Sequence, residues 1–307
     1  MKLNTRVTSL FIQALSQSLS VDMMTVVARR VIPDYDVYER SGFPSNIPMP
    51  RADAARHILK DFYKEGLFFK LVEALIDVHS NGVMGREVPV ALLPRIVAEI
   101  QDQGYRYAAD KGVFVENAER GKTMGWGTLR EGRTYEFALL RLDVAGNSAL
   151  VRRYPPDLVR AAFGAMKDIA TRQVEKRDGR IWCWEGDGGL AAFYFGDKTI
   201  QATLCGIEIL HEMYLFNLLV SRLPEPVSVR LAVHAGPCRF TAAPRDAAGE
   251  TIRKVELLES MYTAPDSLTV SAGVYTDLGG KLSSSFAPVG GASNSSLFRY
   301  QLSWERQ

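Results

Sequence analysis

The chain has 307 residues, of which 47% are hydrophobic and 23% are charged, and its formal net charge is +2. This composition is ordinary for a globular protein, and a chain of this length is expected to form about two domains. The near-neutral charge gives no reason to expect nucleic acid or a membrane surface as a partner.

The cysteine content and the N-terminal residues indicate in which cellular compartment the protein is expected. The three cysteines are widely spaced and odd in number, which argues against a disulfide framework and against a CxxC zinc site. The residues after Met1 do not form the uninterrupted apolar run of a signal peptide, and no apolar stretch approaches the roughly 18 residues of a membrane helix. We therefore expect a cytoplasmic protein whose thiols stay reduced.

Residues 1–115 have the apolar spacing of several amphipathic helices. Side chains recur at helical intervals in four runs: Val7, Leu10, Phe11, Leu15 and Leu19; Ala55, Ile58, Leu59 and Phe62; Phe69, Val72, Leu75 and Ile76; and Leu92, Leu93, Ile96, Val97 and Ile100. The simplest interpretation is a small helical bundle, and the alternative is a regulatory or partner-recruiting module. Residues 116–132 are polar and rich in glycine, and we expect them to be a linker.

Residues 133–307 alternate between strand and helix patterns. In chain order the expected strands are 135–144, 181–184, 190–195, 227–235 and 267–271, and the expected helices begin at Pro155 or span 200–221 and 250–261. The second and third strands form a β-hairpin with Asp187 at its tip. This β-α-β-β-α-β order predicts an α+β fold of the ferredoxin-like kind, with helices on one face of a sheet.

Two aspartates lie at the ends of these strands. Asp143 closes the first strand and is followed by a turn of small residues, and Asp187 lies between Gly186 and Gly188. Neighbouring strands can bring both carboxylates to one place, where they would hold divalent cations. A pair of cations suits phosphoryl transfer on a nucleoside triphosphate. Taken alone, Asp143 could cap a helix and Asp187 could be an ordinary turn residue.

Four motifs around these aspartates resemble, in their order and spacing, the catalytic domain of class III nucleotidyl cyclases, the adenylate and guanylate cyclase family. The family pattern Asp-Ile-x-Gly-Phe-Thr is matched by 143–148 (DVAGNS), and the Gly-Asp hairpin tip by 186–187. The pattern Val-Arg-x-Gly-x-His-x-Gly is matched by 229–236 (VRLAVHAG), and Gly-Asp-Thr-Val-Asn by 249–253 (GETIR). The resemblance extends from about residue 135 to the C-terminus.

The resemblance implies a mechanism in which the ribose 3′-hydroxyl attacks the α-phosphate and pyrophosphate leaves. It implies that Asp143 and Asp187 bridge two Mn²⁺ or Mg²⁺ ions and that the Val144 carbonyl adds a ligand. It also implies a turn whose backbone N–H groups bind phosphate oxygens. That turn consists of Val144, Ala145, Gly146, Asn147 and Ser148.

The positions that read the base depart from the family pattern. Members that use purines place a lysine before the Gly-Asp tip and an aspartate before the Gly-Asp-Thr segment, and these positions fall on Cys183 and Asp246. A thiol cannot supply the ammonium donor that a purine N1 invites. The family's transition-state asparagine falls on Arg253 and its phosphate-binding arginine on Leu257. We expect Arg253 to take over the stabilisation of charge.

This combination most resembles the pyrimidine cyclases of bacterial Pycsar antiphage defence. It implies an enzyme that uses UTP, or less readily CTP, and whose cyclic product acts on a separate effector. Class III sites form between two catalytic domains, so the resemblance implies a homodimer in which Asp143 and Asp187 face the partner's Asp246 and Arg253. The alternatives are a purine cyclase and an inactive homologue that only binds nucleotide.

Other conspicuous residues have simpler interpretations. His234 and the pair Trp182 and Trp184 lie on expected strands, where side chains of these types more often pack than bind ligands. A loose basic group, Arg245 with Arg253 and Lys254, belongs either to a triphosphate site or to a solvated helix face.

Overall fold

The structure is a computed structural model that describes residues 3–83, 85–117, 122–241, 249–290 and 296–302. Two compact units make up the chain, Met1–Arg130 and Glu131–Gln307. Each unit has a hydrophobic core of its own. The division between them falls inside the expected linker, 116–132.

The first unit is mainly helical. Its helices are α1 (Thr5–Ser18), α2 (Val21–Arg29), α3 (Val37–Ser41), α4 (Arg51–Glu65), α5 (Phe68–Asn81) and α6 (Leu93–Asp102). The four expected apolar stripes lie on or directly beside α1, α4, α5 and α6 and supply about half of the buried core, which confirms the helical prediction. Among the described residues no single helix has both the length and the hydropathy of a membrane span, and α1 and α2 reach them only as a pair bent by 115°.

A β-hairpin that the sequence pattern did not predict follows α6. Its strands, β1 (Tyr105–Ala108) and β2 (Val113–Glu116), pair antiparallel. The backbone N–H of Phe114 donates to Oε1 of Glu73 on α5 at 2.9 Å, and the Phe114 ring stacks on Phe69 with centroids 5.3 Å apart. Strands this short carry too few alternating residues to be recognised from periodicity.

The described part of the expected linker packs onto the first unit. Thr123 donates its hydroxyl to Oε1 of Glu116 at 2.7 Å, and the Tyr105 hydroxyl donates to the carbonyl of Gly127 at 3.2 Å. The side chain of Trp126 is completely buried. Residues 122–130 are therefore an ordered part of the first unit.

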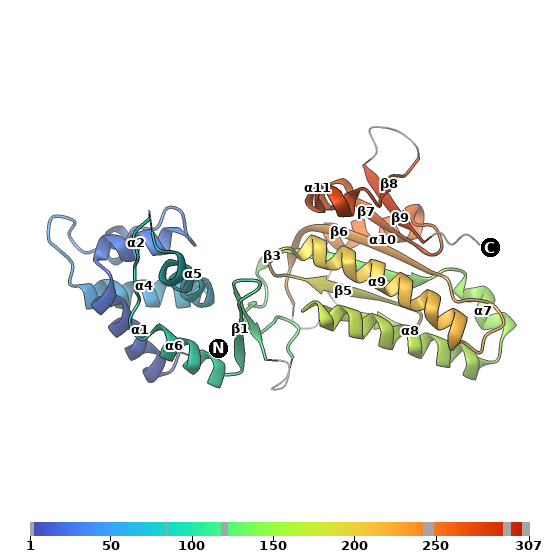
Figure 1. The fold of residues 1–307 in the computed structure, drawn as a ribbon, viewed down its shortest axis with the longest axis horizontal. Helices are drawn as coiled ribbons and strands as arrows, with labels where there is room; N and C mark the ends of the chain where they lie inside the picture. Colours follow the sequence, from blue (N-terminus) through green and yellow to red (C-terminus); the bar gives the residue numbers. More distant parts are fainter. Residues whose placement is uncertain (1–2, 84, 118–121, 242–248, 291–295, 303–307) are drawn as a thin grey trace. The chain divides into compact units, whose positions relative to one another are not determined.

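The described residues of the second unit form a seven-stranded sheet with helices (Figure 1). The strands are β3 (Thr134–Val144), β4 (Arg180–Glu185), β5 (Gly188–Phe193), β6 (Val229–Arg239), β7 (Ser267–Ser271), β8 (Ala287–Pro288) and β9 (Leu297–Gln301), in the spatial order β4-β5-β3-β6-β7-β9-β8. The helices are α7 (Asn147–Arg153), α8 (Pro156–Lys176), α9 (Lys198–Leu219), α10 (Glu250–Tyr262), α11 (Ala272–Asp277) and α12 (Gly279–Ser283). The run β3-α8-β4-β5-α9-β6 has the expected β-α-β-β-α-β order, which confirms the α+β prediction.

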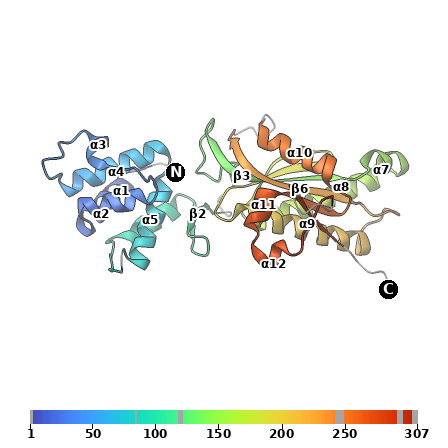
Figure 2. The same ribbon diagram turned by 90° about the horizontal axis from the view of Figure 1, so that it is seen from above.

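Helices cover both faces of this sheet, which differs from the expectation of helices on one face (Figure 2). Alternate residues of β3 and β6 pack with α8 and α9 in the main core: Ala138, Leu140, Leu142, Val229, Leu231 and Val233. The residues between them, including Asp143 and Arg230, therefore belong to the opposite face, where α10 lies. Helix α10 buries Ile252 and Val255, and this apolar stripe needs a sheet face to cover it.

Candidate active site

Asp143 lies one residue before the end of β3, on the face that α10 covers, and its side chain is 21% exposed. After Val144 the chain turns sharply into α7. Gly146 makes this turn with a φ of +73°, in the left-handed region that favours glycine. A Cβ atom built on Gly146 meets nothing within 4 Å, so the backbone conformation, rather than lack of space, requires glycine here.

Asp187 lies at the tip of the hairpin between β4 and β5, as the sequence predicts. Glu185 pairs with Gly188, which leaves Gly186 and Asp187 as the two-residue loop. Gly186 takes the first loop position with a φ of +56°. A glycine at that position is typical of the type II′ turn, whose twist matches that of the flanking strands.

The register of the sheet brings Asp143 to the hairpin tip. Leu142 pairs with Gly189 on β5, so Asp143 lies beside Gly188, the residue that follows Asp187. A Cβ atom built on Gly188 would lie 2.8 Å from Oδ1 of Asp143 and 2.7 Å from the carbonyl oxygen of Leu142. Only glycine leaves room at this position for the hairpin to pass so close to the Asp143 carboxylate.

The backbone of Val144 faces the same tip. Ala145 donates its N–H to the carbonyl of Ser228 next to β6, at 2.9 Å. Because the hydrogen-bonding direction alternates along a strand, the N–H and C=O of Val144 point to the β5 side. The Val144 carbonyl is thus placed to add an oxygen ligand beside the aspartates. The N–H of Ala145, in contrast, is used within the sheet, which removes one of the phosphate donors expected from the turn.

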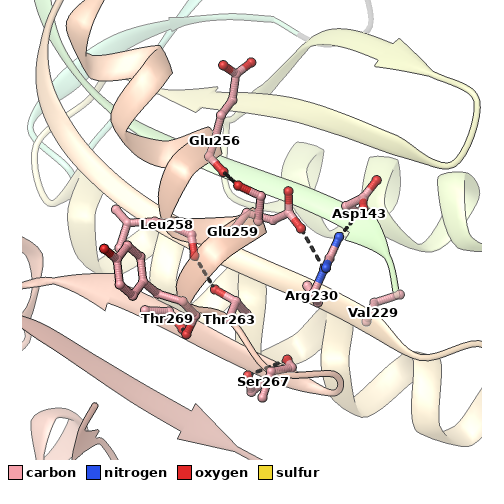
Figure 3. Close-up of polar contacts among 12 residues, drawn as sticks. Asp143, Val229, Arg230, Glu256, Leu258, Glu259, Thr263, Ser267 and Thr269 are labelled. Carbon is pink, nitrogen blue, oxygen red and sulfur yellow. Dashed lines mark hydrogen bonds and ion pairs between the residues drawn. The ribbon is translucent and has the colours of Figure 1, made fainter. Parts of the chain in front are cut away.

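One guanidinium joins Asp143 to a second carboxylate (Figure 3). Arg230 pairs with Asp143 in the β3–β6 register, and its Nη2 donates to Oδ2 of Asp143 at 2.7 Å. Its Nε lies 2.8 Å from Oε1 of Glu259 on α10, in an ion pair that lacks the angle of a hydrogen bond. Asp143 and Glu259 therefore approach Arg230 from two different elements, β3 and α10.

Glu259 is the most buried member of this cluster. Its side chain is 6% exposed, whereas that of Arg230 is 25% exposed. Burial raises the pKa of Glu259, and the Arg230 guanidinium acts in the opposite direction. A carboxylate in such a position is stable only with a charged partner, because an unpaired buried charge is costly.

The sequence analysis assigned no role to Arg230 or Glu259, although a feature of the sequence points to each of them. Arg230 stands inside the strand motif at 229–236. Glu259 falls on the same helical stripe as Ile252 and Val255, where a charged residue has to find a partner.

Two polar atoms near the aspartates are shielded from solvent without a hydrogen-bond partner among the residues that the structure describes. They are Nε of Arg141, two residues before Asp143 on the same face, and Oδ1 of Asn147, in the turn that follows. Most buried polar atoms in proteins are satisfied. These two atoms are therefore polar groups that the described part of the chain leaves unsatisfied beside the aspartates.

The donor set fits a hard divalent cation. Within the described ranges, no group of three or more His, Cys, Asp or Glu side chains is close enough together to hold a metal ion. Asp143, Asp187 and the carbonyl of Val144 offer only part of a coordination shell. Mg²⁺ and similar ions are often bound through one or two carboxylates, with phosphate oxygens of the substrate and water completing the shell.

The other predicted residues that the structure describes, Arg253 and Ser148, are exposed. Arg253 lies on the exposed side of α10, and Leu257, one turn later, is 52% exposed. Ser148 is exposed at the start of α7. Asp246 and Arg245 lie outside the described residues.

Cys183, the residue at the expected base-reading position, lies in the same row of the sheet as Arg141. Cys183 pairs with Leu190, and Leu190 pairs with Arg141. Burial raises the pKa of the Cys183 thiol, with the Arg141 charge opposing it. The side chain is a neutral thiol at physiological pH, so it offers no cationic donor to a base.

His234 and Trp182 make contacts typical of structural residues. Nδ1 of His234 is 2.9 Å from the hydroxyl of Ser271, and burial lowers the pKa of the imidazole. Trp182 is buried, and its ring packs edge-on against Phe137 with centroids 4.8 Å apart.

Part of the chain is similar to solved nucleotidyl cyclase structures. It matches the guanylyl cyclase domain of the RhoGC fusion protein from the aquatic fungus Blastocladiella emersonii over 52% of this chain and 91% of that chain, with 15% identity and a TM-score of 0.45. It matches the adenylate/guanylate cyclase/hydrolase from Silicibacter pomeroyi over 56% and 99%, with 21% identity and a TM-score of 0.46. It matches the adenylyl cyclase CyaB from P. aeruginosa over 57% and 97%, with 17% identity and a TM-score of 0.45. No protein-family model and no curated protein matches the chain.

Proposed function

We propose that the second unit is a nucleotidyl cyclase that converts UTP, and less readily CTP, to the 3′,5′-cyclic monophosphate and pyrophosphate. The observation that carries this proposal is the position of Asp143 beside the hairpin tip that holds Asp187. With the carbonyl of Val144, the two carboxylates offer oxygen ligands for Mn²⁺ or Mg²⁺. We propose two such ions in each site. Such a set suits phosphoryl transfer on a nucleoside triphosphate.

The reaction forms a bond between the ribose 3′-oxygen and the α-phosphorus. The bond from the α-phosphorus to its bridging oxygen breaks, pyrophosphate leaves with the electron pair, and the hydroxyl proton passes to solvent. Bound cations would lower the pKa of the 3′-hydroxyl and neutralise charge on the triphosphate. In this chain Asp143 and Asp187 would hold the cations, and the turn at Gly146 and Asn147 follows Asp143 in the chain. Arg230, 2.7 Å from Asp143, places a planar guanidinium suited to phosphate oxygens next to the carboxylate.

The preference for a pyrimidine rests on Cys183. The resemblance to class III cyclases places a lysine there in members that read a purine, and a half-buried thiol cannot replace its ammonium donor. No described residue distinguishes a C4 carbonyl from a C4 amine. UTP is therefore the first substrate to test, and CTP is the second.

A homodimer with composite sites is part of the proposal. Arg253 lies on the exposed side of α10, whereas Asp143 and Arg230 lie on the sheet side, where Glu259 meets them. Next to Arg253, α10 also exposes an apolar strip: Leu257 (52% exposed), Met261 (69%) and Tyr262 (45%). Exposed apolar patches rimmed by polar residues are typical of protein interfaces. A second copy of this chain would bury the strip and present its Arg253 to the first copy's triphosphate.

Leu257 supports a second candidate function, nucleotide binding without turnover. The family pattern places a phosphate-binding arginine at this position, and an exposed leucine cannot bind phosphate. If the exposed Arg253 does not compensate for it, the chain binds nucleotide and releases no pyrophosphate.

For the biological role we propose a cytoplasmic second-messenger enzyme of antiphage defence, with the first unit as its regulatory or interaction part. The resemblance to the Pycsar pyrimidine cyclases supports this role. The cyclic product would act on a separate effector that binds cyclic nucleotides.

The test is an assay of the purified full chain with Mn²⁺ or Mg²⁺ and each of the four nucleoside triphosphates. Chromatography of the nucleotides and release of pyrophosphate are measured together. The proposal predicts a cyclic monophosphate from UTP, or from CTP to a lesser extent. Conversion of ATP or GTP alone would show a purine cyclase instead. Binding of a nucleotide without any pyrophosphate would show the inactive homologue.

A further inference from the structure

The Glu259 carboxylate has no role in the reaction described above, yet it is the most deeply buried charge near Asp143. It lies on α10, with its side chain 6% exposed and its Oε1 2.8 Å from Nε of Arg230. The same guanidinium donates from Nη2 to Asp143 at 2.7 Å. Arg230 is thus shared between a carboxylate on β3 and a carboxylate on α10 (Figure 3).

This sharing affects how firmly Arg230 holds Asp143. A guanidinium between two carboxylates is attracted to both of them. A divalent cation that approaches Asp143 therefore competes with a guanidinium whose positive charge is partly compensated by Glu259. Without the charge of Glu259, Arg230 has Asp143 as its one close carboxylate among the described ion pairs. The cation then has to displace the Arg230 guanidinium from Asp143 without a second carboxylate on α10 to pair with that guanidinium.

We propose that Glu259 is a positioning residue of the metal site, which holds Arg230 so that Asp143 can exchange the guanidinium for a divalent cation. The inference rests on the proposed metal-binding function of Asp143 and Asp187. It goes beyond that function because it assigns a role to a residue that touches neither the cations nor the nucleotide. It also distinguishes positioning from simple support of the fold, since the two roles differ in what happens when Arg230 is removed as well.

The experiment measures Mn²⁺ binding to the full chain without nucleotide, from the electron paramagnetic resonance signal of free Mn²⁺, so that it does not depend on turnover. The variants are Glu259→Gln, Arg230→Gln and the double variant with both changes. Glutamine keeps the size of Glu259 and can pair with a second glutamine at position 230. The matched control is Glu256→Gln, an exposed glutamate one turn earlier on α10. Thermal unfolding of each variant is followed in parallel.

Glu259→Gln should weaken Mn²⁺ binding about tenfold, as expected for the loss of one charge interaction in a partly buried site. The double variant should restore binding at least to the wild-type level, because Arg230 no longer competes for Asp143. Glu256→Gln should bind Mn²⁺ as the wild type does. A double variant that binds as weakly as Glu259→Gln would overturn the positioning role, because loss of structural support cannot be repaired by removing Arg230. Wild-type binding by Glu259→Gln would overturn it too.

If Glu259→Gln does not fold, Glu259→Asp keeps the charge and withdraws it by one methylene. Glu259→Asp should weaken Mn²⁺ binding less than tenfold. Adding Arg230→Gln to this variant should again restore Mn²⁺ binding. Unchanged binding, or a loss that Arg230→Gln does not repair, would overturn the inference. A wild-type chain that binds no Mn²⁺ would overturn the proposed metal site and this inference together, whereas the outcomes above overturn the inference alone.

Discussion

Arg230 and Asp143 face each other across the β3–β6 ladder, and Nη2 of Arg230 donates to Oδ2 of Asp143 at 2.7 Å. The carboxylate proposed to bind a divalent cation is therefore paired with a cationic side chain of the protein itself. This pairing keeps the sheet face stable while the site holds no substrate, since a half-buried aspartate without a partner would be costly. In the proposed metal site, a divalent cation that binds Asp143 would take the place of Arg230.

Replacement of the aspartates should abolish turnover through the loss of cation ligands. Asp143→Asn and Asp187→Asn keep the size of each side chain but weaken its binding of a divalent cation. Each should lower the rate of pyrophosphate release by about a thousandfold or more. Raising the Mn²⁺ concentration should recover part of the rate if the defect lies in cation binding. Full activity of Asp143→Asn would contradict the metal role.

Gly188→Ala should damage the site by steric conflict alone. The new methyl group would lie 2.8 Å from Oδ1 of Asp143 and 2.7 Å from the Leu142 carbonyl, so the hairpin or Asp143 has to move. We expect a loss of about 1–3 kcal/mol in the free energy of unfolding and a fall in activity larger than that loss alone explains. Chemical denaturation and the cyclase assay measure the two effects.

The matched control for that substitution is Gly164→Ala. Gly164 is in the interior of α8, and a Cβ atom built there meets nothing within 4 Å. Alanine should raise the free energy of unfolding by about 0.5–1 kcal/mol and leave activity unchanged. If both substitutions affect activity equally, the close contact at Gly188 is not the cause.

The pH dependence of stability should show the titration of His234. Burial lowers the pKa of this imidazole from 6.5, Lys254 lowers it further, and Glu250 opposes both. The unfolded chain therefore takes up a proton before the folded chain does, so stability falls as the pH drops below 6.5 and levels off once the folded imidazole is also protonated. Urea unfolding at several pH values measures this slope. His234→Gln should remove its contribution, and an identical slope in that variant would refute the assignment.

Mixing two inactive chains should restore activity if the sites are composite. Asp143→Ala removes a cation ligand, and Arg253→Ala removes the group expected from the partner. In a mixed dimer one site carries both defects and the other carries neither, so random pairing restores about a quarter of the wild-type sites. The measurement is pyrophosphate release after the two chains are mixed and re-equilibrated. Mixtures that stay inactive would contradict the shared-site arrangement, and an active Arg253→Ala chain would refute the role of Arg253.

The parts of the site that could be predicted from sequence depend on local patterns. Alternation along β3, the Gly-Asp tip and the apolar run of β5 place Asp143 near a strand end and Asp187 at a hairpin tip. That β3 and β5 are neighbours was expected only from the β-α-β-β-α-β order. The helical stripes of the first unit were predictable for the same reason, since each is complete within one helix.

The parts that could not be predicted depend on contacts distant in the sequence. The pairing of Arg230 with Asp143 follows from the β3–β6 register, and that with Glu259 from the face on which α10 packs. Neither the register nor the packing face is encoded in the residues around Arg230 alone. The β1–β2 hairpin was missed because four-residue strands carry little periodicity, and its attachment through Glu73 is again a distant contact.

Helix α10 carries Glu259 on its buried side and Arg253 on its exposed side. In the proposed dimer this one helix serves two active centres, its own through Glu259 and the partner's through Arg253. When a cation takes Asp143 from Arg230 at one centre, any adjustment of α10 also moves Arg253 at the other. The two centres should therefore not act independently, and the rate plotted against nucleotide concentration should depart from a simple hyperbola.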